Sequence, residues 1–180
     1  MTVVEALDAI VCGLGPSVRG WHAPEGVCIF GVNDIARHLT PYHLVVVDRP
    51  DRFSDDRRKV IESTRGRVAW MASPGGWRLS CSIVKHLELD NVNIKEPLQV
   101  DGPHIPQYQT SPFAATALAF QLGFRRIGII GVDLIDHKLA PRVAKIDAMF
   151  GKLRSAIAER GAQLFNLSSI SLLHSLPRIS

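Results

Sequence analysis

The chain contains a series of short apolar runs, and each run is followed by a turn or by a helical pattern. The runs are rich in valine, isoleucine and cysteine, and their apolar residues do not alternate strictly with polar ones. This composition is typical of strands that are covered on both faces of a parallel sheet. The runs are AIVCGLG (9–15), GVCIFGVND (26–34), HLVVVDRP (43–50), RVAWMAS (67–73), RRIGIIGVDLI (125–135) and AQLFNLS (162–168).

Helical segments lie between several of these runs. The segment SPFAATALAFQLGF (111–124) starts with Ser-Pro and reaches a glycine, Gly123, near its end, as helices commonly do. The segment APRVAKIDAMFGKLRSAIAERG (140–161) carries apolar residues at helical spacing from Val143 to Ile157. Strands that alternate with helices predict an α/β fold with a doubly wound, mostly parallel sheet of the Rossmann-like kind.

The length and composition indicate a globular protein. A chain of 180 residues with 46% hydrophobic and 21% charged residues fits one domain, 1–180. Within it, the glycine- and proline-rich segment 74–109 is predicted to be irregular, with one short strand near Ser82–Leu87. No apolar run approaches the roughly 18–20 residues that span a bilayer. Residues 1–11 lack the basic region of a secretory signal, so we expect a cytoplasmic protein without a membrane span.

The net charge and the cysteines limit the partners only loosely. A net charge of +4 is compatible with an anionic small molecule, with a nucleic acid or with an ordinary basic surface. The three cysteines have no spacing typical of a zinc site. We therefore expect reduced thiols and no structural metal.

A glycine-rich stretch, Gly13-Leu14-Gly15-Pro16-Ser17, follows the first predicted strand and precedes a predicted helix. In doubly wound sheets, ligands bind at the carboxyl ends of the strands where the strand order reverses. Glycines allow a ligand to approach the backbone, and N–H groups at a helix start attract anions. The stretch therefore predicts a nucleotide-binding loop that includes Gly13, Gly15 and Ser17. The alternative is an ordinary turn with Ser17 as the helix cap.

Polar residues also end the second and third predicted strands. Asn33, followed by Asp34, could contact a ribose or a base, or one of the two could cap the segment DIARHL (34–39). Asp48 could bind a sugar hydroxyl or a metal, and Arg49 could pair with a phosphate. The alternative for Asp48 and Arg49 is an ion pair with each other or with charged residues at 55–58.

Two further groups of polar residues belong to the second half of the chain. Thr110 and Ser111 precede Pro112 at a helix start, where free N–H groups could meet a ligand even if Ser111 serves as the cap. Asp133 and His137 follow the most strand-like run, and we predict that both are catalytic residues. An imidazole titrates near neutral pH, so His137 is a candidate general base, whereas a lone loop histidine is more commonly a surface residue.

Taken in order, these motifs resemble those of the bacterial sialyltransferases that build lipooligosaccharide. The resemblance is carried by GLGPS (13–17), IFGVND (29–34), TSPFAATALAFQLGFRRIGIIGVDL (110–134) and GAQLFNLSS (161–169). It extends to the wider Rossmann-like group that includes archaeal hydroxymethyl-dihydropterin pyrophosphokinases. The resemblance implies that Gly13, Gly15 and Ser17 approach a nucleotide phosphate, that Asn33, Thr110 and Ser111 contact the nucleotide, and that His137 is the base.

The chain departs from the family pattern at three places. Leu14 stands where the family has a polar residue, and Pro112 stands where it has a glycine. The segment after Asp133 is too short for the family's lid, whose tyrosines hold the leaving phosphate. Arg49 or another cation would then have to replace those tyrosines. Either segment 74–109 or a second subunit of a homo-oligomer would have to exclude water from the donor.

The resemblance therefore implies a small glycosyltransferase-like enzyme that transfers a sugar from a nucleotide-sugar donor to a hydroxyl acceptor, with no cofactor required. Three alternatives remain open. The first is an ATP-dependent pyrophosphokinase or phosphotransferase, which would need Mg²⁺ held by carboxylates such as Asp48 and Asp133. The second is a nucleotide-binding module without catalysis. The third is a glycosyltransferase that modifies a nucleic acid.

Overall fold

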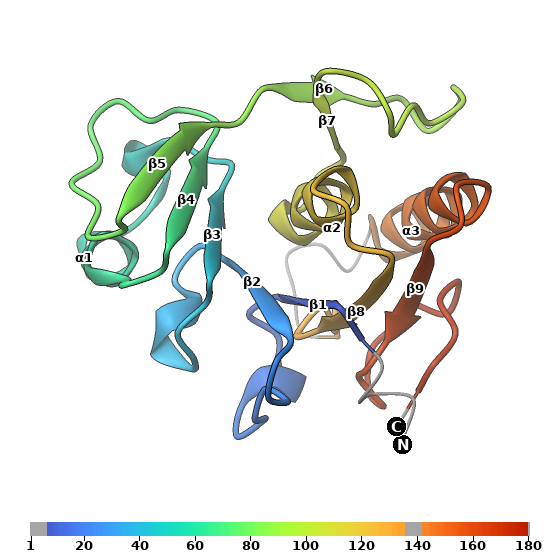
Figure 1. Cartoon of the computed structure of the whole chain (residues 1–180), viewed down its shortest axis with the longest axis horizontal. Helices are drawn as coiled ribbons and strands as arrows, with labels where there is room; N and C mark the ends of the chain where they lie inside the picture. Colours follow the sequence, from blue (N-terminus) through green and yellow to red (C-terminus); the bar gives the residue numbers. More distant parts are fainter. Residues whose placement is uncertain (1–6, 136–141, 180) are drawn as a thin grey trace.

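The computed structural model describes residues 7–135 and 142–179. Seven parallel strands form one sheet in the order β5-β4-β3-β2-β1-β8-β9 (Figure 1). The predicted α/β fold with a doubly wound parallel sheet is therefore confirmed. The strands are β1 (Ala9–Cys12), β2 (Cys28–Val32), β3 (His43–Val46), β4 (Val68–Met71), β5 (Ile83–His86), β8 (Arg126–Ile130) and β9 (Gln163–Asn166).

Three α-helices flank the sheet in the described part of the chain: α1 (Asp55–Ser63), α2 (Ser111–Gln121) and α3 (Val143–Ala158). Successive residues of a strand face opposite sides of a sheet. Ala9 and Val11 of β1 accordingly belong to the core under α2 and α3, whereas Ile10 and Cys12 belong to a second core with α1. Both faces of the sheet are thus covered, which explains the unbroken apolar runs. No helix of the described residues is long and apolar enough to cross a membrane.

The strand order reverses at the middle of the sheet. From β1 the chain runs outward through β2, β3, β4 and β5, and it then returns to place β8 on the other side of β1. Val11 of β1 is consequently aligned with Phe30 of β2 on one side and with Ile129 of β8 on the other. The loops that leave the carboxyl ends of β1 and β8 therefore meet at the switch point of the sheet.

Segment 74–109 contains more regular structure than the sequence predicts. The expected short strand is present as β5, at the edge of the sheet. Two further strands, β6 (Leu89–Asn91) and β7 (Ile105–Gln107), form a small parallel pair that lies above α2 in Figure 1. The sequence gives almost no indication of this pair. β6 has three residues, of which only Leu89 is apolar, and Pro106 in β7 has no backbone N–H to donate to a neighbouring strand.

The predicted helix after the glycine-rich stretch is wrong. Pro16–Val18 form only a single 3-10 turn, and so do Ile35–Arg37 within the segment DIARHL. The loop after β1 therefore has no helix N-terminus that could attract a phosphate. The helix N-terminus that contributes to the site described below is instead the start of α2.

The first residue of β3, His43, makes the stability of the fold depend on pH. Its ring is 9% exposed and stacks on Phe30, and its Nδ1 atom accepts a hydrogen bond from Trp70 Nε1 at 3.2 Å. Burial, together with the charge of Lys85, lowers the pKa of His43 to about 4. Below pH 6.5 the unfolded chain binds a proton at this site that the folded chain does not, so stability falls as the pH falls toward 4.

We expect the free energy of unfolding to decrease by about 2 kcal/mol between pH 8 and pH 5 through His43 alone. Denaturant unfolding at the two pH values measures this difference. The His43→Gln variant, which keeps a hydrogen-bond acceptor but does not titrate, serves as the control. The difference should shrink by about that amount in the variant. An unchanged difference would show that His43 is not the titrating group.

Candidate functional site

A cavity of about 660 Å³ lies at the carboxyl ends of the strands, at the switch point of the sheet. We call it the switch-point cavity. The loops after β1, β2, β3 and β8 and the first turn of α2 contribute to its walls. The predicted site residues that line it are Gly15, Asn33, Asp48, Thr110, Ser111 and Asp133.

The other predicted residues lie elsewhere. Gly13 and Ser17 belong to the loop after β1 but do not line the cavity. Arg49 does not line it either, and its guanidinium lies 3.4 Å from the Asp51 carboxylate at an exposed position. Arg49 is therefore paired locally, but with Asp51 and not with Asp48 or with the charged residues at 55–58 that the sequence suggested. His137 lies outside the described residues, so its role as a base stays a prediction.

The two glycines of the loop after β1 are required by chain packing. A Cβ atom on Gly13 would lie 2.3 Å from the Gly131 carbonyl oxygen, and one on Gly15 would lie 2.5 Å from Asp133 Oδ2. The loops after β1 and β8 are this close because Gly15 N–H donates to the Gly131 carbonyl at 2.6 Å. Close approach by the neighbouring loop, rather than by a ligand, is sufficient to explain both residues. Their role in nucleotide binding stays a prediction.

Asp133 holds three segments of the chain together. Its carboxylate is 1% exposed and accepts hydrogen bonds from Ser17 N–H (2.8 Å), from Ser17 Oγ (2.7 Å) and from Ser168 Oγ (2.6 Å). Ser17 Oγ in turn accepts the N–H of Gly131 at 2.9 Å. We call these residues the Asp133 cluster. The carboxylate is thus occupied by structural contacts, and its predicted catalytic role stays untested.

The backbone around the switch-point cavity is unusual. In the described residues, three non-glycine residues have positive φ: Asn33 (51°), Gln109 (54°) and Leu134 (60°). All three line the cavity. A positive φ is tolerated by asparagine but costs about 1 kcal/mol for a residue such as leucine. Backbone strain of this kind concentrates at functional sites, where the surrounding structure maintains it.

Two buried polar atoms on the cavity wall have no hydrogen-bond partner among the described residues: Asn33 Oδ1 and Thr110 Oγ1. Thr110 is 8% exposed and is the N-cap residue of α2, yet its side chain makes no capping bond. Ser111, which the sequence suggests as the cap, is instead the first residue of the helix, and its Oγ lies 3.5 Å from Asn33 Nδ2. A buried polar atom without a partner is costly, and it is commonly satisfied by a ligand or by water.

The cavity has a fixed cation that the sequence does not reveal. Arg57 of α1 lines it and donates from Nε (2.9 Å) and Nη2 (2.7 Å) to Asp34 Oδ1, while its guanidinium lies 5.0 Å from the centre of the Phe53 ring. Asp34 is buried and also accepts a hydrogen bond from Arg37. Burial raises the pKa of Asp34, but the bonds with Arg57 and Arg37 outweigh this effect and hold the pKa below its usual range. Arg57 is thereby positioned before any ligand binds.

A second cation, Arg19, lines the same cavity and is exposed. Among the residues that the structure describes, no side chain pairs with its guanidinium. Arg19 lies only two residues beyond Ser17, so the polar stretch after β1 could have indicated it. Arg57 and Gln109 gave no such signal, because both reach the cavity through tertiary contacts rather than through a strand end.

Two acidic residues line the cavity among the residues that the structure describes, Asp48 and Asp133. Asp48 is exposed, and Asp133 is bonded to the two serines. Over residues 7–135 and 142–179, no three histidine, cysteine or carboxylate side chains gather where they could hold a metal ion.

Comparison with protein-family models, with curated proteins and with solved structures gives no significant match to this chain.

Proposed function

We propose that the switch-point cavity binds a nucleotide and that the protein transfers a sugar from a nucleotide-sugar donor to a hydroxyl acceptor. The observation that carries the nucleotide site is the pair of buried, unpartnered oxygens, Asn33 Oδ1 and Thr110 Oγ1, beside an uncapped helix start. Asn33 Oδ1 can only accept, so it favours a ligand with an N–H or O–H donor, such as a base amine or a ribose hydroxyl.

The start of α2 supports a phosphate in the same cavity. A helix N-terminus presents N–H groups and the positive end of the helix dipole, which together favour an anion. Thr110 leaves these groups without a side-chain acceptor, and its own hydroxyl is available to donate. Pro112 removes one N–H donor from the first turn, so Arg19, whose guanidinium has no partner among the described residues, supplies the remaining positive charge, and Arg57, whose charge is balanced by Asp34, offers further N–H donors.

The transfer requires one bond to form and one to break at the anomeric carbon of the donor. The acceptor oxygen attacks this carbon, and the bond to the phosphate oxygen breaks, so that the nucleotide leaves with the electron pair. Arg19 would neutralise part of the charge that develops on the leaving phosphate, and Arg57 would donate hydrogen bonds to it. The proton of the acceptor hydroxyl would pass to a base, for which His137 is our candidate on sequence grounds. The Asp133 carboxylate is engaged elsewhere and is not assigned this role.

A thermal-shift screen with CMP, CDP, UDP, GDP and ATP, each with and without Mg²⁺, tests the proposal. A ligand at about 100 times its Kd adds roughly 2.7 kcal/mol of stability, which is a readable shift. A shift that needs no metal and that disappears in Asn33→Ala supports a nucleotide site of the transferase kind. A shift that requires ATP with Mg²⁺ would favour phosphoryl transfer instead. No shift with any nucleotide contradicts the proposal.

Binding and transfer are separated by a second measurement. The nucleotide that gives the shift is offered as its sugar conjugate, and release of free nucleotide is followed with and without candidate acceptors. Release that depends on an acceptor supports transfer. Binding without any release would show a nucleotide-binding module that lacks catalysis.

We expect Arg19→Gln to raise the Kd of the bound nucleotide about tenfold, because it removes an unpaired charge next to the phosphate. Arg49→Gln is the matched control, since Arg49 is also exposed but does not line the cavity. Its Kd should stay within about twofold of that of the unaltered protein. Isothermal titration calorimetry measures both values. Equal effects of the two substitutions would indicate a general charge effect and not a contact at the site.

A further inference from the structure

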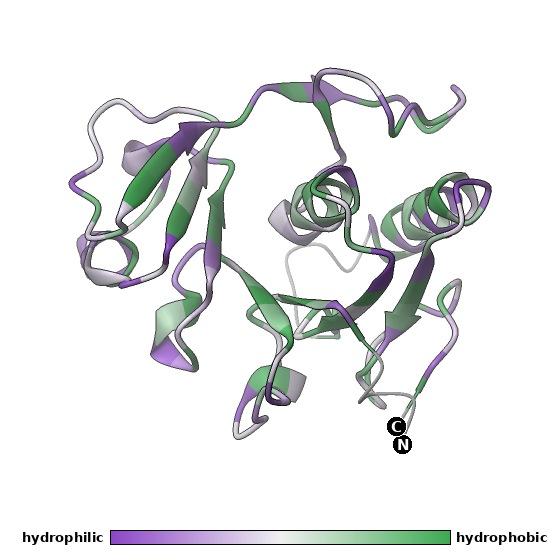
Figure 2. Ribbon diagram, in the orientation of Figure 1, coloured by the Kyte–Doolittle hydropathy of each residue, from purple (hydrophilic) through white to green (hydrophobic). Residues whose placement is uncertain are grey.

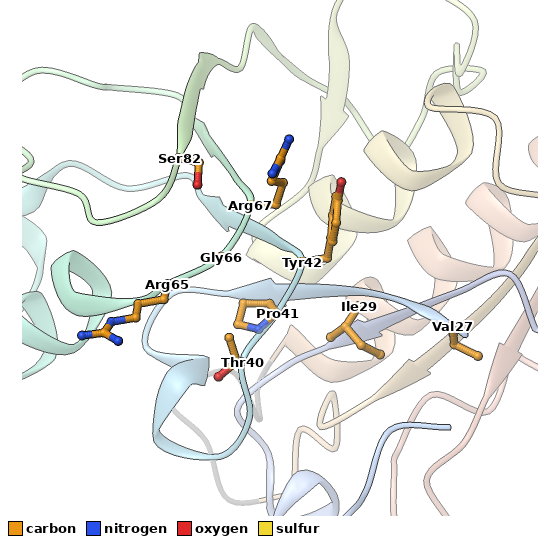
Figure 3. Close-up of a pocket in the computed structure, with 9 residues that line it drawn as sticks. All are labelled: Val27, Ile29, Thr40, Pro41, Tyr42, Arg65, Gly66, Arg67 and Ser82. Atoms are coloured by element: carbon orange, nitrogen blue, oxygen red, sulfur yellow. The ribbon is translucent and has the colours of Figure 1, made fainter. Parts of the chain in front are cut away.

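Whereas the switch-point cavity lies at the carboxyl ends of the strands, a second pocket lies at their amino-terminal ends. It has a volume of about 430 Å³ and is lined by residues that precede or start β2, β3, β4 and β5, among them Thr40, Tyr42, Arg65, Arg67 and Ser82 (Figure 3). We call it the amino-edge pocket. No carboxylate lines it, so its two arginines give it a positive charge. In the described part of the chain, neither guanidinium has a partner.

Two residues of this pocket, Tyr42 and Arg67, are neighbours on adjacent chain segments, because Arg67 N–H donates to the Tyr42 carbonyl at 2.9 Å. In Figure 3, Tyr42 and Arg67 point to the same side of the sheet edge, whereas Arg65 extends in another direction. Tyr42 is 51% exposed, the largest value among the exposed large hydrophobic residues of the described chain. An exposed aromatic ring beside an unpaired guanidinium offers a stacking surface and an anion site together.

The backbone fixes both residues before any ligand arrives. The Tyr42 carbonyl accepts hydrogen bonds from the N–H groups of Arg67 (2.9 Å) and Val68 (3.1 Å), and Tyr42 N–H donates to the Ile29 carbonyl at 3.0 Å. The Tyr42 ring also packs against His43, with 4.9 Å between ring centres and 73° between ring planes. Gly66 lets the two loops approach, since a Cβ there would lie 3.1 Å from the Pro41 carbonyl oxygen. The backbone positions of both residues are therefore fixed, whereas the exposed Arg67 side chain still becomes ordered when it binds a ligand.

We propose that the amino-edge pocket is a second binding site, separate from the switch-point cavity, for a flat ring that carries a phosphate. The ring stacks on Tyr42, and the phosphate accepts hydrogen bonds from the forked donors of Arg67. Thr40 and Ser82 offer hydroxyl groups at the wall of the same pocket. Such a ligand is either a free aryl phosphate or nucleotide, or a nucleotide unit of a single-stranded nucleic acid. The proposal does not depend on the function assigned to the switch-point cavity.

The test is a titration with phenyl phosphate, followed by the amide signals of the protein in two-dimensional NMR spectra. We expect saturable shifts at Gly66, Arg67 and Ser82, and these shifts should follow their own binding curve even if Gly15 and Gly131 of the switch-point cavity also respond. Phenol and inorganic phosphate, which each carry half of the ligand, should bind more weakly than phenyl phosphate. Shifts confined to the switch-point cavity, or no saturable shift, would overturn the proposal.

Variants of the pocket assign the contacts. Arg67→Ala should raise the Kd about tenfold, and Tyr42→Leu about fivefold, because stacking is lost. Arg65→Ala is the matched control within the pocket and should change the Kd by no more than about twofold, since its side chain points elsewhere. Equal effects of Arg65→Ala and Arg67→Ala would overturn the assigned geometry. Unchanged amide dispersion shows that each variant is folded.

A short oligothymidylate distinguishes the two sources of the ligand. Tighter binding than phenyl phosphate at the same amide signals, with a steep dependence on salt, would assign the pocket to single-stranded nucleic acid. Equal or weaker binding would assign it to a free small molecule. Binding of the oligonucleotide that is unaffected by Arg67→Ala would contradict the proposal.

Discussion

Gly13→Ala is expected to lower the free energy of unfolding by at least about 3 kcal/mol, or to prevent folding. The new methyl group would lie 2.3 Å from the Gly131 carbonyl oxygen and 3.0 Å from a methyl group of Val132. A backbone oxygen in a buried loop cannot rotate away as the tip of a long side chain can. The hydrogen bonds from Gly13 N–H to the Ile130 carbonyl and from Gly15 N–H to the Gly131 carbonyl would be stretched together.

Gly102→Ala is the matched control for this substitution. The Gly102 position has open space within 4 Å, and its backbone does not adopt a positive φ. Its replacement should change stability little or raise it by about 0.5 kcal/mol, because the unfolded chain loses freedom. Urea unfolding of both variants measures the difference. A loss of less than about 1 kcal/mol for Gly13→Ala would show that the two loops are not packed as tightly as described.

Asp133→Ala is expected to cost about 3 kcal/mol in the free energy of unfolding. The substitution removes the acceptor of three hydrogen bonds and leaves unpaired donors on the partly buried Ser17 and the buried Ser168. Asp133→Asn keeps the shape of the side chain but replaces one acceptor oxygen by an NH₂ group, which donates. One side of the carboxylate faces the Ser17 N–H and the other faces two hydroxyls, so the amide oxygen must take the first side, and the two hydroxyls must rotate to accept from the NH₂ group on the second.

The comparison of stability with activity decides what Asp133 does. Ser168→Ala removes one of the same hydrogen bonds without changing any group that lines the cavity. If Asp133 is structural, the loss of nucleotide binding in Asp133→Asn and Ser168→Ala should follow their loss of stability. A stable Asp133→Asn variant that binds nucleotide but has no transfer activity would restore its predicted catalytic role.

The sheet and its helices could be predicted from the sequence because they bury apolar residues on both faces. Strands such as β1 and β8 consist mostly of apolar residues, as the colours of Figure 2 indicate. The same pattern can be read from the sequence without knowledge of the fold. β6 and β7 were missed for the opposite reason. They are short and carry few apolar residues, and they pair only because the chain folds over α2.

The candidate site was predictable where a residue follows a strand or starts a helix. Asn33, Asp48 and Thr110 have such positions, and all three line the switch-point cavity. Arg57 extends from α1 to the cavity and is held there by its bond to Asp34. Gln109 lines the cavity in a backbone conformation with a positive φ. Neither feature has a sequence pattern. The glycines were noticed for their spacing, but their packing partner Gly131 lies too far along the chain to be inferred.

The Asp133 cluster joins segments that the ribosome makes at widely different times. Ser17 and Asp133 are 116 residues apart in the sequence. At the usual rate of 5–20 residues per second, a ribosome needs roughly 6 to 23 s to reach Asp133 after Ser17 has been made. During that time β1 has one of its two neighbours at most, and its other edge is open to unrelated chains. The edge of β1 that pairs with β8 in the folded protein therefore stays unpaired in the nascent chain until β8 emerges.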